Sequence, residues 1–588
     1  MVNFLKSFVL ISTCLLLISS VNPTDWKKKV DVDLLNSYNH SDINEFIIQF
    51  TETANLSAAK YIHGKDNKAQ FVYNTLLETA HSSQKTVIEL LSVEQLKYKS
   101  YFIANAVWTK ADIHILEQIA SRPEVKKITA NPWTQTVDFF EDKSASLNRE
   151  PQIEWGIKMI NADSLWRLGF TGQGIVVGGQ DTGYSWEVDP LITKYRGITS
   201  DGDTIHDYSW YDAISEISPL SGDSVVMPAN NPCGLKSPFP CDDLNHGTHT
   251  MGTMVGRDSV NYIGIAPDAK WIGCRNMERG NGKPSTYLDC FQFLFAPTDL
   301  NGENPDLAMA PHVINNSWYC STEEGCNINN WDVLDDAVKA LKASGIFVVV
   351  SAGNNGPGCN TVTGPPAIFE SAFSVGATKP NDTIANFSSR GLVSIDSSFR
   401  MKPNVSAPGQ NVRSVIKNGS FANFNGTSMA GPHVAGMVAI LLSARPELIG
   451  EVETLENIIE QSAVPKTTDQ VCDSIMGSQI PNPVYGYGRV DVLRAYESII
   501  SATKNISQVL DCKIFPNPTN STVHVEIPFS TDLLNYEIYD AKGQLMQTRM
   551  GMQQLPFEIN MSNWARGVYY LRMWNQKSSQ THKIIKLD

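Results

Sequence analysis

Three residues of the types that carry nucleophilic catalysis stand at the ends of predicted strands and helices. Asp181 ends the apolar run GIVVGGQD, His246 begins the helical stretch HGTHTMGTMVG, and Ser428 opens the long apolar helix TSMAGPHVAGMVAILL. A serine hydroxyl is a weak nucleophile until an imidazole takes its proton, and a carboxylate must fix the tautomer of that imidazole. The sequence therefore predicts that Ser428 attacks a carbonyl carbon, His246 carries the proton and Asp181 orients His246.

Two further features favour stabilisation of a negatively charged oxygen beside Ser428. A helix that starts at Ser428 offers a backbone N–H and the positive end of its dipole. In the segment SAGNNG, Asn354 follows a strand and offers a side-chain amide, while Gly353 lets a substrate backbone approach closely. Taken singly, the same residues are an ordinary N-cap serine, loop histidine and turn aspartate, and only their combination indicates a catalytic site.

The elements that position these residues read as a parallel α/β sheet. From Trp155 to about Ile500, apolar strands such as AKWIGC and GIFVVVSAG alternate with helical patterns. That alternation predicts a parallel sheet with helices on both faces, and such sheets carry their sites at the carboxyl ends of the strands. His249 and His433 lie near the predicted site, but we expect both to be structural histidines.

The segments on either side of this region have different patterns of apolar and polar residues. From Asn44 to about Asn131 the pattern predicts a small α+β module with a strand at EFIIQF, a helix at QFVYNTLLETA, one long strand at SYFIANAVW, a helix at ADIHILEQIA and a strand at EVKKITA. The polar stretch FEDKSASLNREPQ resembles a cleavable linker. From about Asp511, short alternating runs without helical period predict a small antiparallel β-sandwich.

Composition and the first residues place the protein outside the cell. The net charge of −14 over 588 residues lacks the basic surface that nucleic-acid binding needs. Residues 1–20 predict a signal peptide rather than a buried helix, and no later run approaches the ~18 apolar residues of a membrane span. Apart from Cys14 and Cys512, eight cysteines remain, and export makes them disulfide candidates. The close pairs Cys233 with Cys241 and Cys320 with Cys326 are favoured, and no CxxC or His-rich spacing supports metal binding.

The motifs DTG, HGTHTMGT, SAGN and GTSMAGPHVAG resemble, in this order, the four signatures of subtilisin-like serine peptidases. The resemblance spans about Trp155 to Ile500 and is closest to the bacillopeptidase F type, through stretches such as WGIKMINADSLWRLGFTGQGIVVGGQDTGY and IGIAPDAKWIGCRNM. It implies that Asp181, His246 and Ser428 are the catalytic triad and that Asn354 is the side-chain donor of the oxyanion hole. No cofactor is implied for the chemistry.

The flanking modules also resemble known ones. The N-terminal module is similar to the inhibitory propeptide of the family, which acts as a folding template and is then cut away. The C-terminal runs, such as FPNPTNSTVHV and YEIYDAKGQLM, resemble the sorting domain of proteins exported by the type IX system of Gram-negative bacteria. We therefore expect the following organisation: a signal peptide at 1–20, a propeptide at 21–132, a linker at 133–154, a peptidase domain at 155–508 and a sorting domain at 509–588.

The resemblance also implies a substrate-binding surface. Ser317, Trp318 and Tyr319 match the strand that pairs with the substrate backbone and lines the primary specificity pocket, although two aromatic core residues would give the same pattern. Gly353 matches a position close to the substrate backbone. Gly364 matches the floor of the pocket.

The sequence departs from the family at three places. Gln180 stands before Asp181 where an apolar residue is usual, and Leu191 stands where many subtilisins carry a calcium-ligating aspartate. The sequence therefore allows a structural calcium ion but does not indicate which residues would bind it. The 65 positions from Asp181 to His246 also exceed the spacing of compact subtilisins, and the additional residues could shape substrate access.

These observations predict a serine endopeptidase that acts on protein or peptide substrates and is made as a self-processing precursor. It would be secreted or held at the cell surface after passage through the periplasm. Two alternatives stay open at this point. A cell-surface adhesin with a disabled peptidase fold would have a broken triad, and an exopeptidase would have a blocked cleft and would release only terminal fragments.

Overall fold

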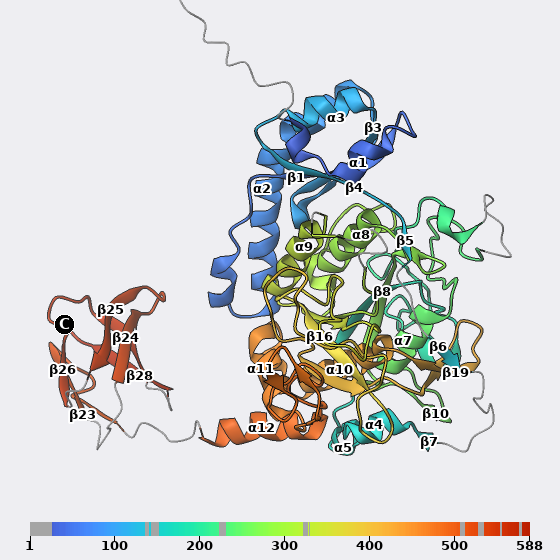
Figure 1. Ribbon diagram of the computed structural model, residues 1–588. Helices are drawn as coiled ribbons and strands as arrows, with labels where there is room; N and C mark the ends of the chain where they lie inside the picture. The colour runs from blue at the N-terminus through green and yellow to red at the C-terminus, as the bar shows by residue number, and fades with distance from the viewer. Residues whose placement is uncertain are drawn as a thin grey trace, which may run out of the picture. The chain divides into compact units, whose positions relative to one another are not determined.

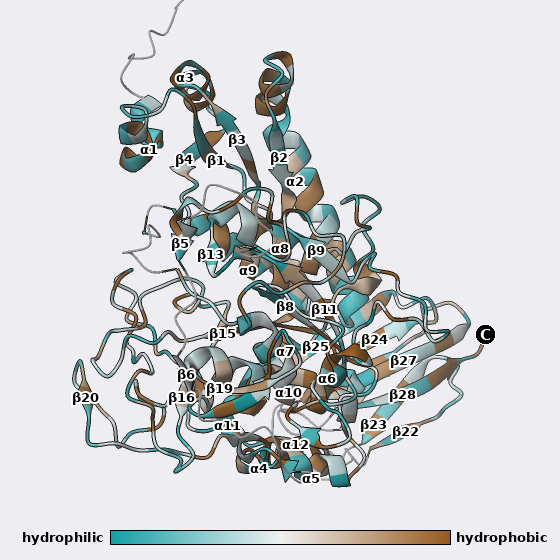
Figure 2. Ribbon diagram, turned by 90° about the vertical axis from the view of Figure 1, so that its right-hand side faces the viewer, coloured by the Kyte–Doolittle hydropathy of each residue, from teal (hydrophilic) through white to brown (hydrophobic). Residues whose placement is uncertain are grey.

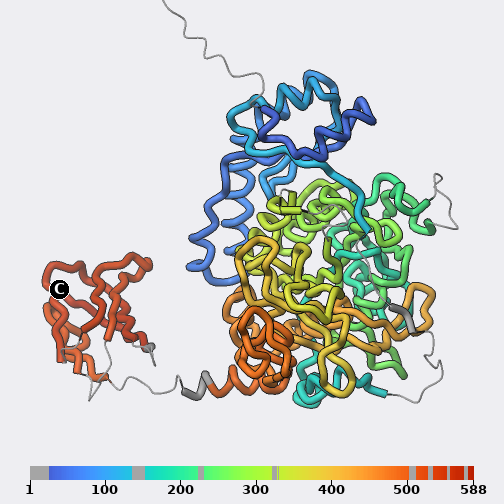
Figure 3. Tube along the Cα trace, in the orientation of Figure 1, coloured from blue at the N-terminus to red at the C-terminus, as the bar shows by residue number. Residues whose placement is uncertain are grey.

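The structure is a computed structural model of the 588-residue chain. It describes residues 26–135, 140–142, 152–222, 231–320, 327–328, 330–505, 512–526, 534–552, 556–574 and 579–588. The expected signal peptide lies outside the described residues. The chain divides into two compact units, Met1–Leu493 and Arg494–Asp588, and each is considered by itself. Figure 3 shows the course of the chain through both.

A seven-stranded parallel sheet organises the first unit, with the strand order β17-β16-β15-β14-β8-β11-β9. The strands are β8 (Val176–Asp181), β9 (Trp210–Asp212), β11 (Lys270–Arg275), β14 (Val313–Asn316), β15 (Phe347–Ser351), β16 (Phe373–Thr378) and β17 (Val405–Pro408). Nearly every residue of these strands is buried, as expected of a parallel sheet covered on both faces. The predicted α/β fold is confirmed. The first strand, β8, lies inside the sheet, so the chain order reverses beside it.

Helices cover both faces of this sheet (Figure 1). On one face, α7 (His246–Val255) and α10 (Thr427–Ala444) pack against each other and against the strands; α8 (Pro284–Phe295) and α9 (Asp332–Ala343) form a second pair. In α9, Val333, Leu334, Ala337, Val338 and Leu341 are buried on one face, as their spacing predicts. Among the described helices, α10 is long and apolar enough to cross a membrane, but 89% of that window is buried, which is typical of a core helix.

The N-terminal module is a four-stranded antiparallel sheet, β2-β3-β1-β4, with the helices α2 and α3 and the short helix α1 (Val32–Ser37) packed on it. Its elements are β1 (Asn44–Phe50), α2 (Lys65–Val93), β2 (Tyr98–Tyr101), β3 (Ala106–Ala111), α3 (Ile113–Ala120) and β4 (Val125–Ala130). The prediction of one strand at SYFIANAVW is wrong. The segment is a hairpin, because the short 3-10 helix η3 (Phe102–Ala104) and the left-handed Asn105 (φ 41°) reverse the chain.

One face of this module belongs to the hydrophobic core of the peptidase region. Ile47, Val72 and Ile103 are completely buried in one cluster with residues of α8 and α9 such as Phe291 and Leu334. Along α2, hydrophobic and hydrophilic stretches alternate in Figure 2, as expected of a helix with one buried face. The module therefore packs on the α8 and α9 pair.

The remaining elements of the first unit are short or peripheral. They are η1 (Trp26–Lys29), η2 (Ser57–Tyr61), β5 (Thr134–Gln135), β6 (Phe140–Asp142), β7 (Gln152–Ile153), α4 (Trp155–Met159), α5 (Ala162–Arg167), α6 (Asp189–Ile192), η4 (Pro219–Ser221), β10 (Asn261–Tyr262), β12 (Met277–Glu278), β13 (Asn281–Gly282), η5 (Leu307–Met309), β18 (Val412–Val415), β19 (Phe421–Asn425), η6 (Pro446–Leu448), α11 (Val452–Ser462), β20 (Val471–Cys472), β21 (Ile475–Met476) and the start of α12 (Val492–Asn505).

The second unit beyond α12 is an all-β module of two antiparallel sheets, β22-β23-β26 and β25-β24-β27-β28. Its strands are β22 (Lys513–Phe515), β23 (Thr522–Glu526), β24 (Leu534–Asp540), β25 (Leu545–Met552), β26 (Phe557–Asn560), β27 (Gly567–Trp574) and β28 (Ser579–Lys586). Val523 and Ile559 from one sheet and Ile538 and Leu571 from the other share a core. The predicted β-sandwich is confirmed.

Disulfides brace the peptidase region. The predicted pair Cys233–Cys241 is present, and the sequence did not distinguish the partners of two others, Cys274–Cys290 and Cys359–Cys472. Cys320 is also disulfide-bonded, while its expected partner Cys326 lies outside the described residues.

The Cys359–Cys472 bridge closes a loop of 113 residues, against 8 for Cys233–Cys241. Since a cross-link restricts the unfolded chain more when its loop is longer, we expect replacing Cys359 and Cys472 by serine to lower the free energy of unfolding by about 5 kcal/mol. The same change at Cys233 and Cys241 should cost about 2.5 kcal/mol. Urea unfolding of both variants under oxidising conditions measures the difference, and equal losses would contradict the loop-length argument.

Candidate active site

Asp181 and His246 meet at the carboxyl edge of the sheet. Asp181 is the last residue of β8 and His246 is the first residue of α7, and the His246 Nδ1 atom lies 2.7 Å from Asp181 Oδ1. Both side chains are buried, and the backbone N–H of Thr182 donates a second hydrogen bond to Asp181 Oδ1 at 2.7 Å. An ionised carboxylate accepts but does not donate hydrogen bonds, so this contact favours the tautomer with the proton on Nδ1.

The glycine after His246 is required by the close approach of α7 to the end of β8. A Cβ atom on Gly247 would lie 2.0 Å from the carbonyl oxygen of Gly183 and 3.1 Å from Asp181 Cβ. The 2.0 Å distance is far shorter than the contacts that Cβ atoms make in proteins. A side chain at position 247 would therefore push His246 away from Asp181.

Asp242 positions the start of α7, and the sequence reasoning missed it. Its Oδ1 accepts hydrogen bonds from the Asn245 backbone N–H (3.1 Å) and from Thr182 Oγ1 (2.8 Å). Its Oδ2 accepts from the backbone N–H and the hydroxyl of Thr248, at 2.9 Å and 2.6 Å. The buried carboxylate thus ties the first turn of the helix to the residue after Asp181. The sequence feature that could have indicated this role is an aspartate that begins a turn four residues before His246.

Ser428 is the second residue of α10, on the helix that packs against α7. Its side chain is only 5% exposed, and its Oγ donates to the carbonyl oxygen of Ser317 at 3.1 Å. In return, Ser317 Oγ donates to the carbonyl oxygen of Ser428 at 2.7 Å. These two bonds join the start of α10 to the segment after β14, so Ser317 and Ser428 lie side by side, and the role of Ser317 in substrate binding stays a prediction.

Asn354 is oriented by the residue before Ser428. Its Oδ1 accepts from the backbone N–H and the hydroxyl of Thr427, both at 2.9 Å. Its Nδ2 lies on the side of Gly426, where a Cβ atom would be 3.5 Å away. The preceding Gly353 has φ +101° and donates its N–H to Thr427 Oγ1 at 3.2 Å, a left-handed conformation that favours glycine. The amide group of Asn354 therefore directs its donor toward the start of α10.

The residues expected in the specificity pocket separate into two groups. The Trp318 side chain is 1% exposed and stacks on Tyr287 with ring centroids 4.1 Å apart, so it is a core aromatic residue. Tyr319 is half-buried, and a Cβ atom on Gly364 would lie 3.0 Å from its Cδ2 and 2.6 Å from the carbonyl oxygen of Cys320. Tyr319 and Gly364 thus lie side by side, while Trp318 supports them from the core.

Gln180, the unusual residue before Asp181, belongs to a row of amides across the sheet. Its Nε2 donates to Asn316 Oδ1 at 2.7 Å, and its Oε1 accepts from Asn276 Nδ2 at 2.9 Å. The Nδ2 of Asn316 donates to the carbonyl oxygen of Val349 at 3.0 Å. The completely buried Gln180 thus has both ends of its amide satisfied by the neighbouring strand ends, which explains why a polar side chain is stable there.

The long segment between Asp181 and His246 is anchored by Arg275 at the end of β11. The buried guanidinium group lies 3.0 Å from Asp212 Oδ2 and 2.5 Å from Asp243 Oδ2. Burial raises the pKa of Asp243 to about 6, although Arg275 acts in the opposite direction. Because Asp243 is next to Asp242, this ion-pair cluster connects the inserted segment to the start of α7.

His249 and His433 are structural residues, as expected. His249 Nε2 lies 3.1 Å from the carbonyl oxygen of Val412 and its ring stacks on Phe424 at 4.2 Å, while His433 Nδ1 lies 2.8 Å from the carbonyl oxygen of Met429. Burial lowers the pKa of His249 to about 3 and that of His433 to about 4. Both imidazoles are therefore neutral near pH 7.

This burial predicts acid sensitivity. With a folded pKa of about 4 against an ordinary 6.5, His433 binds fewer protons in the folded than in the unfolded chain. Stability is therefore retained above pH 6.5 and lost as the pH falls toward 4, by about 1.4 kcal/mol per pKa unit. We expect urea unfolding of the inactive Ser428→Ala chain to show this loss, and His433→Gln to make it smaller. If the chain with both Ser428→Ala and His433→Gln lost as much stability at low pH as the chain with Ser428→Ala alone, His433 would not be the source of the acid sensitivity.

Two short strands after the N-terminal module pair with strands of the peptidase region. β5 pairs antiparallel with β13, with Thr134 opposite Gly282 and Gln135 opposite Asn281. β6 then pairs antiparallel with β19, with Phe140 opposite Asn425, and β19 leads through Gly426 into α10 and Ser428. β6 therefore lies beside the strand that leads to Ser428.

No calcium site emerges where the family resemblance would put one. Leu191 is completely buried, and its carbonyl oxygen accepts a hydrogen bond from Trp271 Nε1 at 3.1 Å. Among the described residues, no group of three or more His, Cys, Asp or Glu side chains is arranged to hold a metal ion. Calcium binding stays a prediction without an assigned site.

Comparison with known families matches two parts of the chain. Residues 172–488 match the Subtilase family, and residues 513–587 match a secretion system C-terminal sorting domain. The first match contains all the candidate catalytic residues. The second covers the strands of the β-sandwich.

Curated relatives are peptidases. The chain is 32% identical to bacillopeptidase F of Bacillus subtilis (strain 168) over 507 residues, which cover 80% of this chain and 32% of that protein. It is 27% identical to M-protease of Shouchella clausii (strain KSM-K16) over 57% of this chain and 70% of the relative. It is 28% identical to subtilisin E of Bacillus subtilis (strain 168) over 55% of this chain and 68% of that relative. The chain thus spans about a third of bacillopeptidase F.

The solved structures agree on the fold. The epidermin leader peptide processing serine protease of Staphylococcus aureus has a TM-score of 0.52 and 17% identity, over 78% of this chain and 99% of that one. A mutant of the same protease gives a TM-score of 0.52 and 16% identity over the same shares. At these identities the similarity concerns the fold alone.

Proposed function

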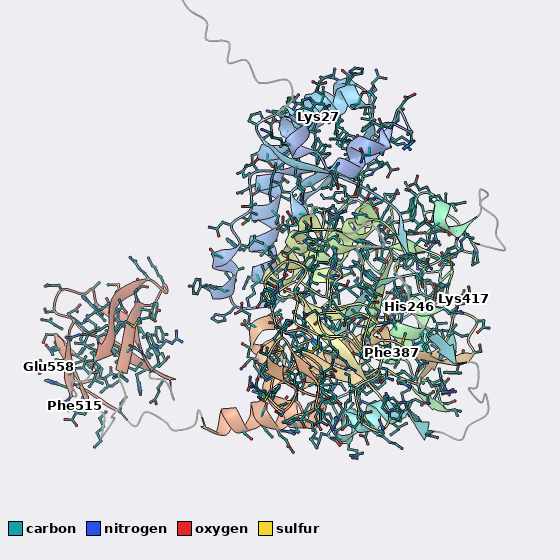
Figure 4. All side chains as sticks on the ribbon, in the orientation of Figure 1. Lys27, His246, Phe387, Lys417, Phe515 and Glu558 are labelled. Carbon is teal, nitrogen blue, oxygen red and sulfur yellow. A yellow bond between two sulfur atoms is a disulfide. The ribbon has the colours of Figure 1, made fainter. Side chains whose placement is uncertain are left out.

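Since the chain belongs to the subtilase family of serine peptidases, we propose that it is a secreted endopeptidase that cleaves peptide bonds through an acyl-enzyme on Ser428. The observation that carries the proposal is the buried 2.7 Å contact between Asp181 and His246, at the start of a helix that packs on the helix of Ser428. Figure 4 labels His246 within the peptidase region.

In the first half of the reaction, Ser428 Oγ attacks the carbonyl carbon of the substrate while its proton passes to His246 Nε2. Asp181 stabilises the imidazolium through Nδ1. The negative charge that develops on the substrate oxygen is stabilised by Asn354 Nδ2 and by the backbone N–H of Ser428. The C–N bond then breaks, and His246 gives its proton to the leaving amine.

In the second half, water replaces the leaving peptide. His246 takes a proton from the water as the water oxygen attacks the acyl carbon, and the same donors stabilise the second tetrahedral intermediate. The ester bond to Ser428 breaks, and the proton returns to Ser428 Oγ. The substrate backbone would bind along Ser317, Trp318 and Tyr319, with Gly353 allowing close approach and Gly364 beside Tyr319 at the specificity pocket.

The N-terminal module fits the role of an intramolecular inhibitor. Lys99 Nζ lies 2.8 Å from Asp289 Oδ1 on α8, and the Phe102 backbone N–H donates to Gln292 Oε1 at 2.9 Å. Lys283, just before α8, lies 3.0 Å from Glu45 Oε2. Such partly buried polar contacts, together with the shared apolar core, support a tight complex between residues 21–132 and the peptidase domain. The linker at 133–154 would then be the segment that is cut.

We predict that the precursor cleaves itself between Gln135 and Phe140. The flanking strands β5 and β6 pair with β13 and with β19, and β19 leads into the helix of Ser428, so we place the cut between these two strands. N-terminal sequencing of the mature enzyme should give a first residue from 136 to 140. A mature N-terminus at or beyond residue 152, with none in the predicted range at early times, would contradict the position.

The C-terminal domain supports export. A sorting domain at residues 513–587 implies secretion or display at the cell surface. We propose that the type IX machinery of a Gram-negative bacterium carries the protein out of the periplasm and that residues 509–588 are then removed.

Digestion of a denatured protein by the purified mature enzyme tests the proposed function. An endopeptidase releases internal fragments, and a fluorophosphonate probe, which reacts with activated serines, should label Ser428. Release of terminal residues alone would indicate an exopeptidase. Intact substrate and no labelling would indicate a binding protein of the adhesin type.

A further inference from the structure

A recess of about 710 Å³ opens between three segments that each lie within about ten residues of a candidate catalytic residue in the chain. Its walls include residues 185–190, which follow the Asp181 turn, residues 239–241, which precede His246, and the turn at 417–419, which leads into β19 and Ser428. Figure 4 labels Lys417 and His246 in the same part of the molecule, and Lys417 Nζ donates to the carbonyl oxygen of Asp243 at 2.8 Å. The recess therefore adjoins all three segments of the candidate active site.

Aromatic side chains from the inserted segment line this recess. Trp186 meets His206 edge to face at a centroid distance of 5.4 Å, and His206 lies 6.4 Å from Phe239. The Phe239 side chain is 49% exposed, although it is apolar. An aromatic wall of this kind accommodates the alkyl stem of a long side chain and attracts a cation to the faces of its rings.

The charge balance of the recess also favours a cation. Asp258 accepts hydrogen bonds from nearby backbone N–H groups, at 2.8 Å from Val260, and the Lys417 ammonium group is held by the carbonyl oxygen of Asp243. Glu187 and Asp189 are exposed and, within the part of the chain that the structure describes, take part in no ion pair or side-chain hydrogen bond. Two carboxylates beside an aromatic wall are therefore available to an incoming positive group.

The backbone of β6 gives the course of a polypeptide toward this recess, because β6 runs from Asn425 to Asn423 of β19 and Phe421 lines the recess. β6 pairs with the edge of β19, the strand that follows the turn at 417–419. β6 follows the predicted cleavage position, so it occupies the side on which the leaving half of a substrate would lie. We infer that the recess is a leaving-side subsite that binds a lysine or arginine side chain of the substrate. This inference rests on the proposed function.

Fluorescence-quenched peptides test the subsite with the mature enzyme. A series with identical residues before the scissile bond carries arginine, glutamine or glutamate at the second, third or fourth position after it. We expect kcat/KM to be about tenfold higher with arginine than with glutamine at one of these positions, as a partly desolvated cation–π and ion-pair site would give. The combined change Glu187→Gln and Asp189→Asn should reduce this ratio to about twofold or less, as the loss of both charges would leave only the aromatic contact.

Charge reversal and a remote control complete the design. Glu187→Lys with Asp189→Lys should make glutamate the preferred residue at the same position. The control Glu303→Gln, at an exposed carboxylate away from the recess, should keep the wild-type ratio. Equal rates for the arginine and glutamine peptides, or a ratio that survives both double changes, would overturn the subsite.

A peptide p-nitroanilide separates the two levels of the proposal, because it has no residues after the scissile bond. If the wild-type enzyme cleaves it and shows no arginine preference, the subsite is wrong and the proposed function stands. If the wild-type enzyme cleaves neither the anilide nor any peptide, the proposed function is wrong, and the subsite, which rests on that function, is wrong as well.

Discussion

Replacing Ser428 by alanine lowers kcat/KM for peptide hydrolysis by roughly 10⁴-fold or more, because no other group can form the acyl-enzyme. The same change should also stop the proposed self-cleavage between Gln135 and Phe140, so that the full precursor accumulates. The Ser428 hydroxyl donates to the Ser317 carbonyl oxygen at 3.1 Å, and the loss of this neutral hydrogen bond should leave the fold intact. Peptide hydrolysis and the intact mass of the purified chain measure both effects.

A serine on the same helix provides the matched control. Ser443 lies near the end of α10, where its Oγ donates to the carbonyl oxygen of Ile440 at 2.7 Å. Ser443→Ala should therefore retain hydrolysis and processing. If Ser428→Ala retained activity as Ser443→Ala does, the assignment of the nucleophile would be wrong.

Replacing Asp181 by asparagine should lower kcat by roughly 10⁴-fold, while KM changes little. The asparagine amide can donate to His246 Nδ1, which places the imidazole proton on Nε2, where it can no longer accept the proton of Ser428. The Thr182 backbone N–H faces the same Oδ1 atom and loses its acceptor, whereas the remaining oxygen, at the Oδ2 position, faces the Thr250 hydroxyl at 3.5 Å. Steady-state kinetics with one peptide substrate separate kcat from KM.

The exposed Asp203 supplies the control for this second prediction. Asp203→Asn removes the same charge at a distance from the site and should leave kcat unchanged. A small effect of Asp181→Asn on kcat, or an effect confined to KM, would show that Asp181 does not set the tautomer of His246.

The parallel sheet and the reactive residues could be predicted from the sequence, because both depend on local patterns. A run such as GIFVVVSAG is apolar throughout only in a strand that is buried on both faces. Asp181, His246 and Ser428 each stand at the end of such an element, where chain direction alone brings side chains to one edge of the sheet. The same reasoning identified the β-sandwich from its alternating runs.

The supporting residues could not be predicted, because their roles depend on partners far away in the sequence. Asp242 is an ordinary turn residue until Thr182 reaches it from the end of β8. Gln180 is an anomaly until Asn276 and Asn316 are placed on either side of it. The hairpin at 98–111 was missed for a related reason, since its apolar residues face two different layers and read as one strand.

The sequence by itself determined which groups are available for chemistry and the order of the elements that carry them. Tertiary structure alone decided which side chains meet: that Trp318 packs in the core while Tyr319 lies beside Gly364, that Cys359 pairs with Cys472, and that Trp186, Glu187 and Asp189 share a recess with the turn at 417–419. The physical reason is that periodicity reports burial along one element, whereas contacts between distant segments follow from how the buried faces pack together.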